Sequence, residues 1–321
     1  MTILMTGLCE KGADQIWKQC NDAMYAQGVT WLEEAAYAGD AEAWFFLGHC
    51  YSWGDGAVGF NEKKAYECYL RGASAGSARA VLGALRAGQY DEQMKQSARY
   101  SIEECYRQVR DAAEMGDVYA AWQMGEAVEW EDLADYMPQT ESAREQCLFW
   151  YERAADGGII PAMVKMGKCC QNGTYREKDE KEALRWANQC AASGEVWGLF
   201  QMGEHYRQEE DWEAAFQYDY AAAKQGSSRA MLYLGQMYLN GQGTERDIQA
   251  AVQALENAAA RNEAESFEEL GNLFYQDELV ERDDEKAFYW YGKAYAAGFT
   301  SSIVIVVSVS EFLPRLPIKE T

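Results

Sequence analysis

Small, apolar and aromatic residues recur along the chain at spacings that match one face of a helix. Seven times an apolar residue directly precedes a glycine, with a small residue five positions before that glycine and often an aromatic residue three positions after it. The glycines are Gly48, Gly83, Gly125, Gly167, Gly203, Gly235 and Gly271. Side chains about four residues apart lie on the same side of a helix. The pattern therefore predicts an amphipathic helix around each glycine.

A second motif, such as "AAYAG" ending at Gly39, closes each unit with a residue suited to the left-handed end of a helix. These closing residues are Gly39, Gly76, Gly116, Gly158, Gly194, Gly226, Asn262 and Gly298. Upstream of six of them, at a constant distance, stand residues that commonly cap the start of a helix: Asn61, Ser101, Asp179, Asp211, Asp247 and Asp283. Each unit is therefore predicted to be a helix, a loop, a second helix and a turn.

Units of about 36 residues cannot bury their apolar faces alone, so neighbouring units must stack. We divide the chain into a degenerate first copy at 1–39, an array at 40–298 and a segment at 299–321. The array consists of 40–76, 77–116, 117–158, 159–194, 195–226, 227–262 and 263–298. The last segment contains the β-branched run Ile303 to Val307, then Pro314 and Pro317. We expect it to form a capping helix, with a strand-like arm that docks on a partner as the alternative.

The order of small residue, Leu-Gly, Tyr, Gly-x-Gly, Asp, Ala, aromatic and Ala-Ala-x-x-Gly resembles the Sel-1-like repeat, a relative of the tetratricopeptide repeat. The resemblance covers roughly residues 40–298, and the units at 77–116 and 117–158 depart from it in their loops. It implies an all-α fold, a right-handed α-solenoid of about seven to eight helix-loop-helix repeats. It also implies a concave face, lined mainly by the first helices, in a protein that acts as an adaptor.

The stretch Gly241-Gln242-Gly243 could also be taken for a phosphate-binding loop. Such loops follow a strand, and the P-loop of nucleoside triphosphatases also carries Lys-Ser or Lys-Thr. Here a predicted helix precedes the glycines, Thr244 to Asp247 follow, and the corresponding loops of other units differ in length and glycine content. We therefore predict a turn between two helices and no nucleotide site.

The chain is strongly acidic, with 52 Asp and Glu against 29 Lys and Arg and a net charge of −23. Such a surface repels phosphate backbones and anionic lipid, so nucleic acid and membrane are poor partners. A basic protein is the natural complement. Solubility of a long molecule is an equally good explanation of the acidity, and both stay open.

Little in the sequence indicates catalysis or metal binding. The first residues lack a basic leader and a long apolar core, and no run is long enough to span a membrane, so we expect a cytoplasmic protein. Most of the nine cysteines occupy core positions of the repeat, which predicts free thiols and no zinc. The two histidines, His49 and His205, are far apart in sequence and are expected on exposed faces. We expect no catalytic site, cofactor or metal.

The resemblance places variable, exposed residues two positions before each unit glycine, and acidic runs follow some of them. We predict that a protein partner contacts Phe46, His49, Gln123, Glu126, Glu129, Glu131, Asp132, Gln201, Glu204, Tyr233 and Glu269. Apolar packing remains an alternative role for Phe46 and Tyr233, because aromatic residues serve both cores and interfaces. A solvated outer face is the alternative for the acids.

Two functional hypotheses follow. Sel-1-like repeats also occur in proteins encoded beside bacterial toxins, and this, with the acidity, suggests an immunity protein that neutralises a basic, nuclease-like toxin. The alternative is a general adaptor or regulatory scaffold in a signalling or secretion complex. The first hypothesis predicts a complex that weakens steeply with salt, and the second predicts apolar anchoring.

Overall fold

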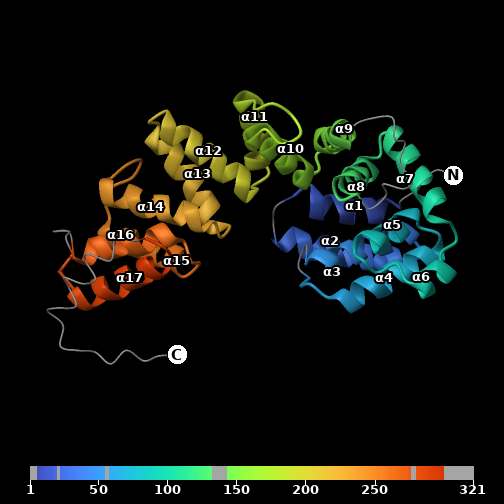
Figure 1. The fold of residues 1–321 in the computed structure, drawn as a ribbon, viewed down its shortest axis with the longest axis horizontal. Coiled ribbons are helices and arrows are strands. Elements are labelled where there is room, and N and C mark those ends of the chain that lie inside the picture. The colour runs from blue at the N-terminus through green and yellow to red at the C-terminus, as the bar shows by residue number, and fades with distance from the viewer. Residues whose placement is uncertain (1–5, 20–21, 55–57, 132–142, 276–279, 300–321) are drawn as a thin grey trace. The chain divides into compact units, whose positions relative to one another are not determined.

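The protein is all-helical, as the sequence predicted. A computed structural model describes residues 6–19, 22–54, 58–131, 143–275 and 280–299 (Figure 1). These residues form seventeen helices and contain no strand. The chain divides into two compact units, an N-terminal unit of residues 1–198 and a C-terminal unit of residues 199–321. The division falls inside one helix, α12 (Val196–Gln208).

The N-terminal unit is a stack of helix pairs. Its helices are α1 (Gly7–Trp17), α2 (Asp22–Tyr37), α3 (Ala41–Trp53), α4 (Glu62–Ala75), α5 (Ala78–Arg86), α6 (Glu92–Ser97), α7 (Ile102–Glu114), α8 (Val118–Glu129), α9 (Ala143–Asp156), α10 (Ile160–Asn172) and α11 (Glu180–Ala192). The closest neighbours are consecutive helices, such as α1 with α2, α3 with α4 and α8 with α9. The short helix α6 is an insertion between α5 and α7, in the unit whose loop departs from the repeat pattern.

The C-terminal unit follows the same plan. Beyond α12 it contains α13 (Trp212–Lys224), α14 (Ser228–Asn240), α15 (Ile248–Ala259), α16 (Ala264–Tyr275) and α17 (Asp284–Ala296). The pairs α14 with α15 and α16 with α17 pack most extensively. A separate apolar core, which includes Leu232, Leu255, Leu270 and Tyr291, holds these helices together.

The helix ends lie where the sequence placed them. The side chains of all six predicted capping residues accept a hydrogen bond from a backbone N–H in the first turn of their helix. All eight predicted closing residues have a positive φ, between 60° and 102°. Each cap satisfies a backbone donor that the helix itself leaves free. Local chemistry therefore fixes the length of each helix.

The repeat glycines let a ring of the second helix approach the first helix closely. A Cβ atom added at Gly48 would lie 2.6 Å from the Tyr69 ring, and one added at Gly83 would lie 2.7 Å from the same ring. Tyr69 is almost completely buried between these two glycines. Any larger residue would have to displace the ring, which explains why glycine occupies this position of the repeat.

The Gly241 to Gly243 stretch is a turn, as predicted. It connects α14 to α15, and both glycines have left-handed backbones, with φ of 67° and 68°. A Cβ atom at Gly243 would lie 2.0 Å from the Trp212 carbonyl oxygen, so only glycine fits there.

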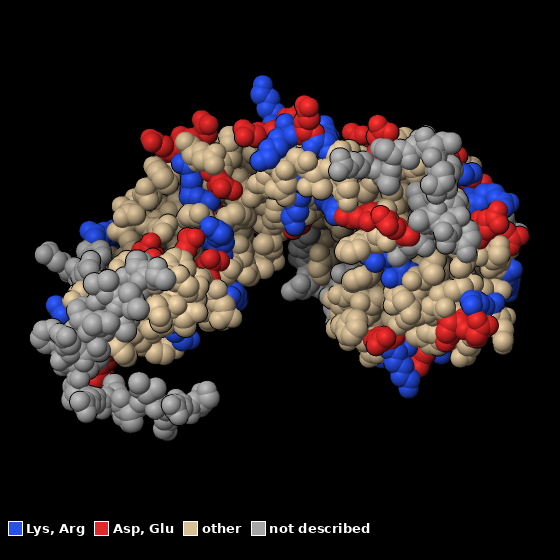
Figure 2. Space-filling model, viewed as in Figure 1, with Lys and Arg blue, Asp and Glu red and all other residues tan. Residues whose placement is uncertain are grey.

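Three further properties of the described residues concern the cysteines, the apolar length of the helices and the surface charges. All eight cysteines within the described residues are free and buried, as expected for core positions. No helix within the described residues is long and apolar enough to cross a membrane. On the visible face of each unit, basic side chains lie among acidic ones, and no single acidic field covers either unit (Figure 2).

Candidate functional site

The residues two positions before the unit glycines behave differently in the two halves of the chain. Phe46 and Gln123 are buried, and Val81 between them is buried as well. The four later residues at this position are partly exposed: Lys165, Gln201, Tyr233 and Glu269. The expectation that Phe46 is exposed to a partner is wrong, because none of its surface is accessible.

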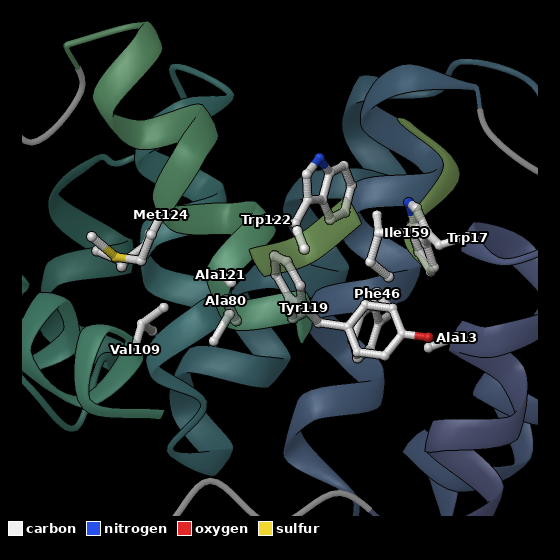
Figure 3. Packing of buried hydrophobic residues seen from close by; sticks show 14 of the residues in the cluster. Ala13, Trp17, Phe46, Ala80, Val109, Tyr119, Ala121, Trp122, Met124 and Ile159 are labelled. Atoms are coloured by element: carbon white, nitrogen blue, oxygen red, sulfur yellow. The ribbon is translucent and has the colours of Figure 1, made fainter. Parts of the chain in front are cut away.

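Helices α3 and α8 are closed at this position because α1 packs across them. The ring of Trp17 lies 5.2 Å from that of Phe46, 5.7 Å from that of Trp122 and 6.3 Å from that of Tyr119 (Figure 3). The Tyr119 hydroxyl donates a 2.6 Å hydrogen bond to Asp14 on α1. Aromatic side chains thus cover the faces of α3 and α8 that would otherwise be open to a partner.

His49 and Gln123 belong to the same packed region. The His49 ring lies 4.7 Å from that of Trp122, and its Nε2 is 3.9 Å from a carboxylate oxygen of Glu126. The Gln123 side chain donates a 3.0 Å hydrogen bond to the carbonyl oxygen of Arg79. His49, Gln123 and Glu126 line one small pocket together, but His49 is 7% exposed and Gln123 is 6% exposed. The expectation that His49 lies on an exposed face is therefore wrong.

The acidic run after Gly125 is partly structural. Glu129 accepts a 2.7 Å hydrogen bond from the Tyr151 hydroxyl and forms an ion pair with Lys165, so it joins α8 to α9 and α10. Glu131 is exposed, and its backbone has a left-handed φ of 58°. Asp132 lies outside the described residues. Among the described acids of this run, Glu131 is the one exposed to a partner.

The C-terminal unit contains an open groove of about 650 Å³. Residues from α12 to α16 line it: Arg207, Trp212, Tyr233, Gln236, Met237, Leu239, Asn240, Gln242, Arg246 and Glu269. Two of the predicted contact residues, Tyr233 and Glu269, are among them. Gln201 and Glu204 lie on α12 at helical spacing before Arg207, and their side chains approach each other at 3.4 Å. The structure thus brings two predicted residues, Tyr233 and Glu269, into the lining of one groove.

Arg207 is fixed at the edge of this groove. Its guanidinium forms an ion pair with Asp219 of α13 and lies 3.8 Å from the centre of the Tyr233 ring. Asp219 is completely buried, and burial raises the pKa of its carboxyl to about 6, although Arg207 acts in the opposite direction. Asp219 stands seven residues before its closing glycine, where Tyr69, Tyr151 and Tyr291 stand in other units. A buried ion pair therefore lies at a position that the other units fill with an aliphatic or aromatic side chain.

Carboxamides form much of the remaining lining. Gln236 donates a 2.9 Å hydrogen bond to Glu269, which connects α14 to α16. Asn240 and Gln242 approach each other at 3.4 Å at the end of α14. Arg246 is exposed in the turn before α15. The charged lining is two arginines and one glutamate, so the acidity of the chain is not concentrated in this groove.

Sequence reasoning missed Arg207, Gln236, Asn240 and Arg246. One signal was available for Arg207, since a carboxylate at a core position such as Asp219 needs a buried cation nearby. The lining contains no histidine, cysteine, serine or lysine. Within the described residues there is also no group of three or more potential metal ligands. The groove offers guanidinium, amide and aromatic groups, which suit the binding of a polypeptide.

Stacked pairs of helices with an open groove beside the first helices define a helical-repeat protein that binds other proteins. The Sel1 repeat model matches residues 23–40, 41–77, 118–159, 160–195, 228–263 and 268–299, more than half of the sequence. The chain belongs to the Sel1 repeat family. The segment between 195 and 228 is not matched, and it contains α13 with the unusual Asp219.

Known proteins support the same fold. An uncharacterised protein of Neisseria meningitidis serogroup B is 28% identical over 189 residues, which are 58% of this chain and 36% of that protein. The chain therefore spans about a third of the length of this curated relative. A protective antigen of uropathogenic Escherichia coli with an SLR fold has a TM-score of 0.55 and 20% identity, with 91% of this chain and 71% of that chain covered. A Sel1 repeat protein from Oxalobacter formigenes has a TM-score of 0.54 and 21% identity, with 94% and 85% covered.

Proposed function

We propose that this Sel1 repeat protein is a non-catalytic interaction scaffold that holds one partner polypeptide in the groove of the C-terminal unit. The observation that carries the proposal is the position of Tyr233. It is partly exposed, stacks on Arg207 and lines an open groove, whereas Phe46 at the same repeat position is sealed beneath Trp17. Aromatic and arginine side chains of this kind dominate the binding energy of protein interfaces.

The groove is also large enough for this role. Its volume of about 650 Å³ lies within the range of sites that enclose a small molecule or a short peptide segment. Its lining is held by bonds between helices, such as the hydrogen bond from Gln236 to Glu269, so the surface is formed before a partner arrives. A preformed surface costs little ordering free energy on binding.

We further propose that the partner is a basic protein and that the chain acts in the cytoplasm as the immunity protein of a nuclease-like toxin. The net charge of −23 supports this, because it attracts a basic protein at long range. The eight free, buried cysteines are compatible with a reducing compartment. A general adaptor is the second candidate, favoured by the mixed rather than acidic lining of the groove.

The test is affinity capture from the native cell with the full chain, at low and high salt, followed by mass spectrometry. The Tyr233→Ala variant is compared with Tyr220→Ala, which removes a tyrosine that is 41% exposed on α13, outside the groove lining. We expect retention of the main partner to fall about 30-fold for Tyr233→Ala, since a hot-spot residue contributes about 2 kcal/mol or more. Equal retention by both variants would reject the groove as the binding surface.

The same capture separates the two candidates. One small basic protein, lost at high salt and toxic when expressed alone, supports the immunity proposal. Several partners that survive high salt support the adaptor.

A further inference from the structure

We infer that the groove of the C-terminal unit accepts an extended peptide segment whose acidic side chain is held by Arg246 and Arg207. This inference rests on the proposed function, because it names the chemistry of the partner segment in the same groove. It concerns residues that the repeat pattern does not single out. The charged groups that already have a partner in the groove, and those that do not, determine which side chain it accepts.

The charged groups of the groove differ in the partners that they already have. Glu269, the one acidic residue in the lining, accepts a hydrogen bond from the neutral amide of Gln236. Arg246 is exposed, and no ion pair joins it to any other described residue. A carboxylate is the group that an arginine side chain binds best, because its oxygens match the geometry of the guanidinium donors.

Arg207 provides a second, rigid cation. Asp219 holds one of its terminal nitrogens, and the rings of Tyr233 and Phe200 lie 3.8 Å and 5.5 Å from the centre of the guanidinium. Its other terminal nitrogen, Nη2, is buried and has no hydrogen-bond partner among the described residues. An acceptor oxygen of a bound segment would satisfy this donor, which is costly to leave unpaired, once the side chains that cover the nitrogen move aside. Little side-chain entropy is lost, since the guanidinium is already fixed.

The rest of the lining suits a peptide backbone and an apolar side chain. Gln236 and Asn240 are four residues apart on α14, so they lie on one face of the helix, and Gln242 follows in the turn. Carboxamides both donate and accept, which matches the alternating N–H and C=O groups of an extended chain. Trp212, Met237 and Leu239 supply apolar surface beside them.

The charge of Arg246 in the groove is opposite in sign to the net charge of the whole chain. The net charge acts over the distance of a Debye length, about 8 Å at physiological salt, and attracts a basic protein. The groove acts at contact and selects one acidic residue within that protein. A segment in which an Asp or Glu stands beside an apolar residue, carried by a basic partner, meets both requirements.

The test is a selection of random peptides displayed on phage against the full chain, with the Arg246→Glu variant in parallel. Arg261→Glu is the matched control, because it makes the same charge change at an exposed position outside the groove lining. Circular dichroism checks that each variant is folded. We expect the wild type and Arg261→Glu to enrich peptides with Asp or Glu beside an apolar residue, and Arg246→Glu to lose this preference.

A selected acidic peptide, labelled with fluorescein, then gives the affinity by fluorescence anisotropy. Arg246→Glu should weaken its binding about 3- to 10-fold, and Arg261→Glu by less than about 2-fold. Selection of basic or uncharged peptides by the wild type would overturn the inference. Peptide binding that appears only after residues 300–321 are removed would also overturn it, since the chain's own C-terminal segment would then be the occupant. Peptide binding that changes with the concentration of the chain would overturn it as well, since a second copy would then be the occupant.

The two proposals fail separately. If Tyr233→Ala abolishes binding of the native partner but the selected peptides are not acidic, the groove is the binding surface and the inferred chemistry is wrong. If Tyr233→Ala leaves the native partner bound, the proposed function itself is wrong.

Discussion

The buried Arg79 offers the sharpest test of how the N-terminal unit is stabilised. Arg79 is completely buried, forms an ion pair with Asp117 and lies 3.6 Å through its Nε from Glu42. It therefore joins the starts of α3, α5 and α8. The Arg79→Met variant keeps most of the apolar volume of the side chain but leaves two acidic groups without their cation.

The magnitude follows from the burial of these acids. Glu42 is 6% exposed, and removal of one partner from a buried ion pair costs about 3–5 kcal/mol. Burial raises the pKa of the Glu42 carboxyl while Arg79 lowers it, so loss of Arg79 raises this pKa further. The folded variant then binds a proton that the unfolded chain releases above its ordinary pKa. As the pH rises from the pKa of Glu42 in the unfolded chain to its pKa in the folded variant, the stability of the variant should fall by about 1.4 kcal/mol per pH unit.

Urea unfolding monitored by tryptophan fluorescence measures this effect. Nine of the eleven tryptophans lie in the N-terminal unit, since only Trp212 and Trp290 follow residue 198. The control is Arg71→Met, which removes an exposed arginine that lies 4.9 Å from the Trp44 ring and should cost about 1 kcal/mol or less. Equal losses for the two variants would refute the reasoning, as would a larger loss for Arg79→Met at pH 5 than at pH 7.5.

Two further variants test the packing and the buried carboxylate. Gly48→Ala places a Cβ atom 2.6 Å from the Tyr69 ring and should lower the free energy of unfolding by about 1–3 kcal/mol. The control Gly59→Ala adds a Cβ atom with no other atom within 4 Å and should have little effect. The shift of the urea midpoint measures both effects. Because the pKa of Asp219 is raised to about 6, its contribution to stability is present below about pH 4 and is lost as the pH rises to 6, an effect of about 3 kcal/mol. Asp219→Asn should remove this part of the pH dependence. Thermal unfolding at pH 4 and pH 6.5 measures the difference in stability between the variant and the wild type, and a difference that is the same at both pH values would contradict the raised pKa.

The helices were predictable because their signals are local. A capping side chain such as that of Ser101 and a closing residue such as Asn262 each act on the backbone within a few residues, so their effect can be read from the sequence alone. Repetition strengthened each signal, since the same positions recurred from unit to unit. The fold class followed directly.

The candidate site was only partly predictable because exposure depends on distant residues. The repeat position correctly placed Phe46 and Tyr233 on equivalent faces of their helices. It could not show that Trp17, 29 residues earlier, covers Phe46 while nothing in the described part of the C-terminal unit seals Tyr233 in the same way. The cations of the groove were missed because Arg207 and Arg246 lie outside the repeated positions. Their role depends on loop geometry and on one exceptional core residue, Asp219.

The position of Trp17 also limits how this protein can lengthen during evolution. Repeat proteins commonly grow by tandem duplication of a unit, because each copy contacts only its neighbours. In the N-terminal unit, however, one tryptophan contacts both Phe46 on α3 and Trp122 on α8. A copy inserted between these helices would separate the two rings and expose Trp17 to water. Duplication there would thus be selected against, and new copies would be tolerated only where no side chain ties non-adjacent repeats together.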